Sequence, residues 1–306
     1  MQEQKSKWVK FGAIFAILIM VGSAVLVGLL LTDSGSSDKT TEFPLSDVSG
    51  AKANFTFKNA IDGSKYLPEG VVSISILKIY EGDTIDRGMK AAFPGAEADK
   101  IMMASYMTGR VDYYSLIDEN NVSFVINSSK PQTEMYENHS IIFANPSQRV
   151  IAGNPLILAS FYNYAVDNSL AKRAVDVLSG KASGSTDLND ILAYADNTEV
   201  FDEIIVYKAN SGSSYDKYYE RSSQFINMTT FQLVFQVESI VLQPSAEMKA
   251  DIYALSENAT GDNKITITEE GNALKTYIDS SDVTEFMQDR EALYKIVSDH
   301  TRQSTA

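Results

Sequence analysis

The stretch of sequence that decides the fold is Phe231-Gln-Leu-Val-Phe-Gln-Val-Glu238. Apolar side chains occupy every second position from Phe231 to Val237, and glutamine stands at two of the positions between them. In an extended strand successive side chains point to opposite faces, so this period of two places the apolar set on one face. The stretch therefore predicts a half-buried strand of an antiparallel sheet.

Shorter alternations of the same kind recur along the chain. Isoleucine alternates with serine over 73–76 and with threonine over 265–268. Apolar residues also occupy every second position over 248–254, and a turn-forming stretch follows at 260–263. Because a turn between two alternating segments is the mark of a β-hairpin, we predict a hairpin over 246–269.

Helices are predicted where capping residues precede an apolar stripe. Asp83 and Asp282 are suited to the N-cap position, as is Asn154 followed by Pro155, and Gly180 is suited to end a helix. Mixed with the strands, these helices predict an α+β protein that is rich in antiparallel sheet. The predicted helices cover 83–93, 154–165, about 169–179, and the region from 282 onward.

The N-terminal region contains one long apolar run. Residues 11–31 carry no charge, and at about 1.5 Å per residue a helix of this length spans a hydrocarbon core of about 30 Å. Three lysines precede the run and acidic residues follow it, so the positive-inside rule places the N-terminus in the cytoplasm. We therefore expect an uncleaved, single-pass signal-anchor that holds the rest of the chain outside the cell membrane and contacts the lipid bilayer through residues 11–31.

Composition then suggests a domain plan for the whole chain. The Ser/Thr/Asp-rich segment after the apolar run reads as a flexible spacer, and the Gly/Ser-rich stretch 180–186 divides the remainder into two halves of similar make-up. Each half begins with an apolar strand and ends in a helix, so a duplicated βαβββα unit is an open interpretation. The expected parts are a cytoplasmic tail (1–10), a transmembrane signal-anchor (11–31), a spacer (32–50), and an ectodomain in two halves (51–180 and 181–306).

Charge and residue counts exclude several functions. With 40 acidic and 26 basic side chains the net charge is −14, which would repel a nucleic-acid backbone. The chain has no cysteine, so it offers no disulfide framework and no zinc–cysteine site. Its two histidines, His139 and His300, are expected on the surface. We predict no catalytic residue, no cofactor and no metal site, and we take the Ser214/Lys217 pair as a chance occurrence in a loop.

The residues singled out as modification sites are asparagines in the pattern Asn-x-Ser/Thr. Six such sequons occur in the chain, which is about twice the number expected by chance from its composition. They favour an extracellular glycoprotein. The glycosylation candidates are Asn54, Asn121, Asn127, Asn138, Asn227 and Asn258.

The basic N-terminus, the apolar run, the Ser/Thr/Asp spacer and the cysteine-free, sequon-bearing remainder resemble anchored, single-pass surface proteins of methanogenic and related archaea. The stretch Arg149-Val-Ile-Ala-Gly-Asn-Pro155 and the Ser/Asp-rich segment after Gly180 are similar to part of a family of anchored surface proteins. The functions of these families are unknown, so the resemblance implies an archaeal cell-surface location and supplies no catalytic residue.

Taken together, these features predict a membrane-anchored extracellular binding or structural protein. We expect it to be a non-enzymatic component of a cell-surface or membrane complex, with a protein partner or further copies of itself. Two alternatives remain open at this stage. One is a pilin-like filament subunit, because a basic segment, an apolar run and a β-rich head are also typical of such subunits, and the other is an anchored hydrolase.

Overall fold

A computed structural model of the chain describes residues 41–119, 121–126, 131–162, 169–196, 202–211, 213–261 and 263–302. Its strands are β1 (Thr41–Pro44), β2 (Ala53–Asn54), β3 (Ser73–Lys78), β4 (Glu97–Tyr106), β5 (Gly109–Asp118), β6 (Ser123–Ile126), β7 (Gln132–Tyr136), β8 (His139–Asn145), β9 (Gln148–Ile151), β10 (Gly153–Asn154), β11 (Leu156–Phe161), β12 (Glu203–Lys208), β13 (Lys217–Asn227), β14 (Gln232–Leu242), β15 (Lys264–Glu270) and β16 (Ala273–Ser280). Its helices are η1 (Leu45–Asp47), α2 (Ala60–Ser64), α3 (Thr84–Ala92), α4 (Ser169–Leu178), α5 (Asn189–Leu192), α6 (Ala246–Glu257) and α7 (Val283–Arg302).

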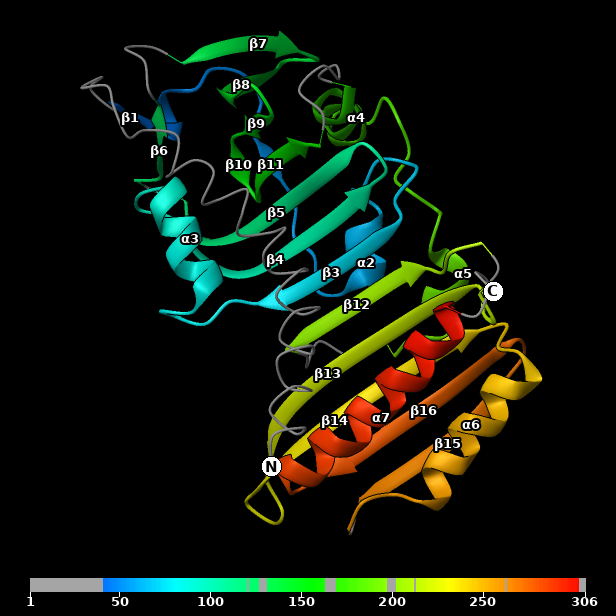
Figure 1. The fold of residues 1–306 in the computed structure, drawn as a ribbon. Coiled ribbons are helices and arrows are strands. Elements are labelled where there is room, and N and C mark those ends of the chain that lie inside the picture. Colours follow the sequence, from blue (N-terminus) through cyan, green and yellow to red (C-terminus); the bar gives the residue numbers. More distant parts are fainter. Residues whose placement is uncertain are drawn as a thin grey trace, which may run out of the picture.

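A single sheet of twelve strands runs through the molecule (Figure 1). Every pair of neighbouring strands in it is antiparallel, in the order β15-β16-β14-β13-β12-β3-β4-β5-β11-β9-β8-β7. The strands of the two halves meet where β3 pairs with β12. The large antiparallel sheet agrees with the alternation seen in the sequence.

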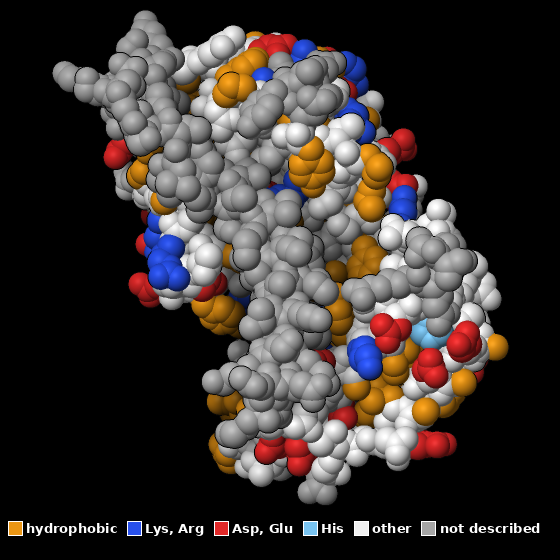
Figure 2. Space-filling model, viewed as in Figure 1, with side chains coloured by type: hydrophobic (Ala, Val, Ile, Leu, Met, Phe, Trp, Pro, Cys, Tyr) orange, Lys and Arg blue, Asp and Glu red, His pale blue; other side chains and the backbone are white. Residues whose placement is uncertain are grey.

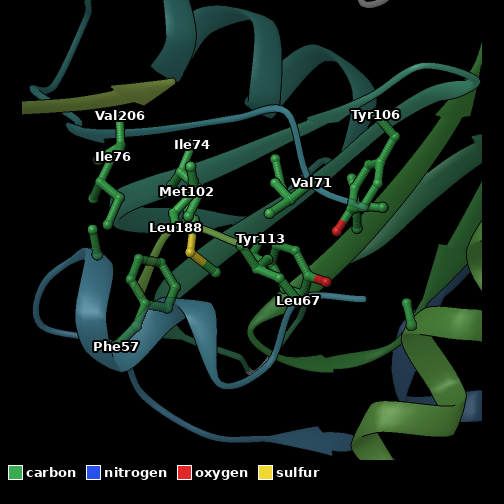
Figure 3. Packing of buried hydrophobic residues seen from close by; sticks show 14 of the residues in the cluster. Phe57, Leu67, Val71, Ile74, Ile76, Met102, Tyr106, Tyr113, Leu188 and Val206 are labelled. Atoms are coloured by element: carbon green, nitrogen blue, oxygen red, sulfur yellow. The ribbon is translucent and has the colours of Figure 1, made fainter. Parts of the chain in front are cut away.

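The junction between β3 and β12 is held by apolar side chains on one face. Ile74 is paired with Val206 and Ile76 with Ile204, and all four are at most 1% exposed. Figure 3 shows Ile74, Ile76 and Val206 with neighbouring side chains of the same cluster, including Phe57 from the segment that precedes α2. Because fully burying each such side chain contributes about 1.5–3 kcal/mol, this cluster is sufficient to join the two halves into one sheet.

Helices cover both faces of the sheet. Side chains from α4 and α5 pack in the cluster that contains Ile74 and Ile76, on one face. On the opposite face α3 and η1 cover the first half, and α6 and α7 cover the second. Figure 1 shows α3 and α7 on the same side of the sheet.

Three predicted helices are confirmed, and local capping explains why the sequence showed them. The N-cap Asp83 accepts a hydrogen bond from the backbone N–H of Asp86 at 2.7 Å at the start of α3. Asp282 accepts hydrogen bonds from the N–H groups of Thr284 and Glu285 at the start of α7. Gly180 follows α4 with a φ of +73°, the left-handed conformation that ends many helices.

The helix predicted over 154–165 is wrong, because residues Leu156–Phe161 form strand β11. This strand lies between β5 and β9 and is buried at every position, so it has no polar face and no alternation to reveal it. Asn154 does not cap a helix. Its side-chain amide instead accepts from the N–H of Leu116 and donates to the carbonyl of Leu116, at 3.0 and 2.9 Å.

The hairpin predicted over 246–269 is also wrong. Residues Ala246–Glu257 form helix α6, and β15 pairs with β16 instead. The side chain of Ser245 caps the helix by accepting from the N–H of Met248 at 3.2 Å. Met248 and Ile252 are both fully buried, and their spacing of four fits one face of a helix as well as it fits a period of two.

The membrane part of the prediction is corrected as well. Across the described residues, no helix is both long enough and apolar enough to cross a membrane. The longest of them, α7, has 20 residues and carries charged side chains along its whole length. The predicted anchor, residues 11–31, lies outside the described residues. The transmembrane helix of the predicted fold class, the signal-anchor and the single-pass location with a cytoplasmic N-terminus are corrected accordingly: the described part of the chain contains no such helix.

The idea of a duplicated βαβββα unit does not hold either. Strands β3, β4, β5 and β11 lie side by side in the same manner as β12, β13, β14 and β16. The helices differ, however, because α3 connects β3 to β4 whereas the described residues between β12 and β13 contain no helix. The helix after β11 and the helix after β16 also pack on opposite faces of the sheet.

The two segments read as linkers contain ordered contacts where they are described. In the stretch 180–186, the N–H of Ser185 donates to the carbonyl of Leu67 at 2.7 Å, and Ser185 is 4% exposed. In the described part of the segment read as a spacer, Phe43 of β1 packs edge-on against Phe124 of β6, with ring centroids 5.6 Å apart. Both segments therefore contribute packing to the folded part.

Candidate functional site: an exposed apolar hairpin

The longest hairpin of the sheet extends past its neighbouring strands. Strands β13 and β14 pair over eleven positions, from Lys217 opposite Leu242 to Asn227 opposite Gln232. Pairing between β12 and β13 stops at Ser222, and pairing between β16 and β14 stops at Phe235. The distal part of the hairpin therefore stands without a strand on either side among the described elements (Figure 1).

The distal part of this hairpin is also uncharged. Charged residues make up 22% of the protein, which has a net charge of −14. Between Arg221 and Glu238, however, sixteen consecutive residues carry no charge. The distal hairpin is therefore a neutral surface on a strongly acidic molecule.

Large apolar side chains are exposed on the distal hairpin and on the first turns of α7. Phe231 is 78% exposed, Met228 76% and Ile226 58%. Figure 2 shows hydrophobic side chains at the lower left, where the hairpin ends in Figure 1. We call this surface the apolar end patch. It consists of Ile226, Met228, Phe231 and Leu233 of the hairpin and Val283 and Met287 of α7.

The patch exists because α7 begins before the hairpin ends. Phe286 of α7 packs against Phe235 of β14, with ring centroids 5.6 Å apart. The pair Ile226–Leu233 lies two residues further along the same face of the hairpin, level with the first residues of the helix. No described helix covers the sheet beyond that point, so the apolar face predicted for 231–238 continues out into solvent.

The tip of the hairpin is held in a defined shape. The side-chain oxygen of Asn227 accepts from the N–H groups of Thr229 and Thr230 at 2.9 and 3.3 Å, and the N–H of Phe231 donates to the carbonyl of Asn227 at 2.7 Å. Phe231 has a φ of +55°, which is rare for a bulky residue. Strained backbone of this kind persists where the surrounding structure imposes it, and it is common at functional sites.

An ion cluster fixes the base of the hairpin to α7. Arg290 donates to Glu220 at 2.6 Å and to Glu203 at 3.1 Å, and the hydroxyl of Tyr218 donates to Glu220 at 2.6 Å. Burial raises the pKa of Glu203, although Arg290 opposes the shift. The cluster therefore joins β12, β13 and α7 just below the neutral part of the hairpin.

A second ion cluster lies on the opposite face of the same strands. Glu238 of β14 is fully buried, lies 3.4 Å from Arg221 of β13, and accepts from the hydroxyl of Tyr277 of β16 at 3.1 Å. Burial and the neighbouring Glu238 raise the pKa of Tyr277 to about 12. Ion clusters on both faces therefore hold the base of the hairpin to its neighbouring elements.

The sequons predicted as glycosylation sites lie on separate elements, and the structure does not bring them together. Asn227 is half-buried at the tip of the hairpin, where its amide holds the turn. Asn127 lies outside the described residues. Glycosylation of these sites stays a prediction. The exposed candidates are Asn54, Asn121, Asn138 and Asn258.

The two histidines are buried, so the prediction that they lie on the surface is wrong. His300 is 2% exposed, and its Nε2 lies 2.9 Å from a carboxylate oxygen of Asp251. His139 is 6% exposed, and its Nδ1 lies 2.9 Å from the carbonyl of Glu137. The ring of His300 thus connects α7 to α6, and the ring of His139 contacts the turn that precedes β8.

The Ser214/Lys217 pair has none of the features of a catalytic dyad. Lys217 forms ion pairs with Asp190 and Asp216 at the start of β13. Burial lowers the pKa of Lys217, but the ion pair with Asp190 more than offsets this, so its pKa is raised. A lysine with a raised pKa stays protonated and does not activate a serine. Within the described ranges, no group of three or more acidic or histidine side chains is placed to hold a metal ion.

The sequence matches no protein-family model, and a search of curated proteins finds no similar protein. The apolar end patch is therefore argued from its geometry and chemistry alone. It was missed from the sequence because the alternation at 231–238 predicts burial along its whole length. The sequence carries no charge over 222–237, but it carries none over 150–166 either, where the buried strand β11 lies, so this feature did not single out the site.

Proposed function

We propose that this chain is a non-enzymatic binding or structural protein that joins a complex through the apolar end patch. The observation that carries the proposal is a set of exposed apolar side chains on a neutral hairpin and on the adjoining first turns of α7 of an acidic protein. Monomeric soluble proteins rarely expose such patches unless a partner covers them.

The energetics favour association at this surface. Phe231 and Met228 are each more than three-quarters exposed, and covering a large apolar side chain contributes about 1.5–3 kcal/mol. The rigid base and the ordered tip lower the entropy that binding would cost, because little of the hairpin must be fixed on contact. Exposed aromatic and methionine side chains are also the types enriched at protein interfaces.

The test is co-purification from the protein's own cells with a matched pair of variants. Phe231→Asp places a charge in the patch, and Met107→Asp places one at the equally exposed turn between β4 and β5, where Met107 is 84% exposed. We expect wild type and Met107→Asp to retain stoichiometric partner chains and Phe231→Asp to lose them. Unchanged circular dichroism of both variants would show that the fold is intact. A complex that survives Phe231→Asp would refute the proposal.

A further inference from the structure

We infer that the partner of the apolar end patch is a second copy of this chain, docked hairpin to hairpin about a two-fold axis. This inference rests on the proposed function and names its partner. Three observations on the distal hairpin carry it: open strand edges, absence of charge, and the size of the exposed apolar surface.

The distal hairpin offers strand edges for pairing. No described strand pairs with the outer edge of β14 over Gln232–Val234, since β16 pairs only from Phe235 onward. An open edge of this kind is a template for another strand. When a two-fold axis perpendicular to the strands relates two copies of the same edge, the two strands run antiparallel, which is the pairing used throughout this sheet.

Charge favours a second copy at this position. Two chains with a net charge of −14 repel each other across most of their surface, and the repulsion is weakest where neither presents a charge. The sixteen residues 222–237 form such a surface. A basic partner would be expected to meet carboxylates, and residues 222–237 of the hairpin carry none.

The size of the patch fits a reversible dimer. If each of the six patch side chains covers on the order of 100 Å², two copies together bury roughly 1,200 Å², which is the lower end of stable specific interfaces. We therefore expect a monomer–dimer equilibrium that depends on concentration. Added salt should strengthen it, because salt screens the repulsion between the acidic surfaces while the apolar contact persists.

The chain's lack of cysteine allows a direct test with the full-length protein. Leu233→Cys places a thiol at the middle of the open edge of β14, where antiparallel pairing about the two-fold axis sets it opposite the same residue of the second copy. Thr108→Cys places a thiol at the exposed turn between β4 and β5. Under mild oxidation we expect Leu233→Cys to form a disulfide-linked dimer roughly tenfold faster or more than Thr108→Cys, because docking raises the effective concentration of the two thiols. Adding Phe231→Asp to Leu233→Cys should return the rate to that of the Thr108→Cys control.

Sedimentation velocity of the unmodified chain completes the test. Wild type should shift from monomer to dimer as its concentration rises, and Phe231→Asp should sediment as a monomer over the same range. Equal cross-linking rates for the two cysteine variants, or a dimer that persists in Phe231→Asp, would overturn the inference. If wild type stays monomeric while other chains still co-purify through the patch, the second-copy inference fails and the proposed function stands.

Discussion

The two central hairpins of the sheet differ in how far their neighbouring strands follow them. In β4–β5 the flanking strands reach the turn, because β3 pairs with β4 as far as Ser105 and β11 pairs with β5 from Gly109. In β13–β14 both flanking strands stop early, at Ser222 and Phe235. Both hairpins are rich in apolar residues, so the reach of the neighbours, not composition, decides which one exposes an apolar surface.

The two hairpins also differ in where they place charge. In β5, Arg110 donates to Asp112 at 2.7 Å, and both side chains are buried beside Ser160 of β11. Burial raises the pKa of Asp112 although Arg110 opposes the shift. In β13–β14 the ionic groups are confined to the base and the distal part is neutral. The first hairpin is thus built into the interior of the sheet, and the second is built to project from it.

The largest effect is expected at the base of the projecting hairpin. Arg290→Ala would leave the buried Glu220 beside the half-buried Glu203 without this counter-charge, and breaking a buried ion pair costs about 3–5 kcal/mol. Urea denaturation measures the loss. Arg87→Ala on the exposed side of α3 serves as the control and should change the free energy of unfolding by less than about 0.5 kcal/mol. A small effect of Arg290→Ala would mean that the base is not a rigid anchor.

The next prediction compares a Met→Ala substitution in each of the two hairpins. Met102 in β4 is fully buried, whereas Met228 at the tip of β13–β14 is 76% exposed. Met102→Ala should cost about 2–5 kcal/mol of stability, since it leaves a cavity in the core. Met228→Ala should change stability by less than about 0.5 kcal/mol and should weaken association instead. If both variants lose similar stability in urea, the hairpin tip is not free of contacts.

The junction between the two halves should respond to acid. Asp187 accepts hydrogen bonds from Lys208, Ser185 and the backbone of Gly70. Burial alone would raise the pKa of Asp187, but these bonds lower it to about 2. A carboxyl whose pKa is lower in the folded chain than in the unfolded chain stabilises the fold while it is ionised. This contribution of about 2 kcal/mol is therefore present above about pH 4, the pKa of an aspartate in the unfolded chain, and it is lost as the pH falls toward 2.

Thermal denaturation from pH 6 to pH 2 checks this expectation. Asp187→Asn should lower stability at pH 6 and flatten the decline between pH 4 and pH 2 relative to wild type. Asp62→Asn, which removes a carboxylate that pairs with the exposed Lys65, is the matched control and should leave the slope unchanged. Parallel declines in wild type and Asp187→Asn would show that the junction does not titrate.

Locally encoded elements could be predicted from the sequence, and elements fixed by distant partners could not. Asp83 and Asp282 cap their helices through bonds two or three residues away, so α3 and α7 were visible in the sequence. Strand β11 was taken for a helix because it is an inner strand between β5 and β9 and both of its faces are buried in the core, so its sequence shows no alternation. Helix α6 was taken for a strand because alanine-rich alternation suits both structures.

The candidate site was hidden for the same reason. The exposure of Phe231 and Leu233 depends on how far β12, β16 and α7 extend along the hairpin. No pattern within 231–238 carries that information. The strand itself was predicted correctly, but its distal apolar residues face solvent rather than a core. The missing charge over 222–237 does not identify an exposed surface by itself, because the uncharged run 150–166 contains the buried strand β11.

The smallest expected effect separates stability from binding at the hairpin tip. Phe231 adopts a left-handed φ of +55° and is 78% exposed, so its side chain contributes strain and little packing to the monomer. Glycine tolerates this conformation, and Phe231→Gly should therefore raise stability by about 0.5–1 kcal/mol. The same variant removes the largest side chain of the apolar end patch and should weaken association.

Gln243→Gly is the matched control for this prediction. Gln243 also has a φ of +55° and is exposed, but it lies at the opposite end of β14, away from the patch. Both variants should gain stability in urea, and only Phe231→Gly should shift the sedimentation equilibrium toward monomer. If Phe231→Gly is less stable than wild type, the phenylalanine serves the fold of its own chain. If it is more stable and still associates like Gln243→Gly, Phe231 is held in strain for a reason other than binding.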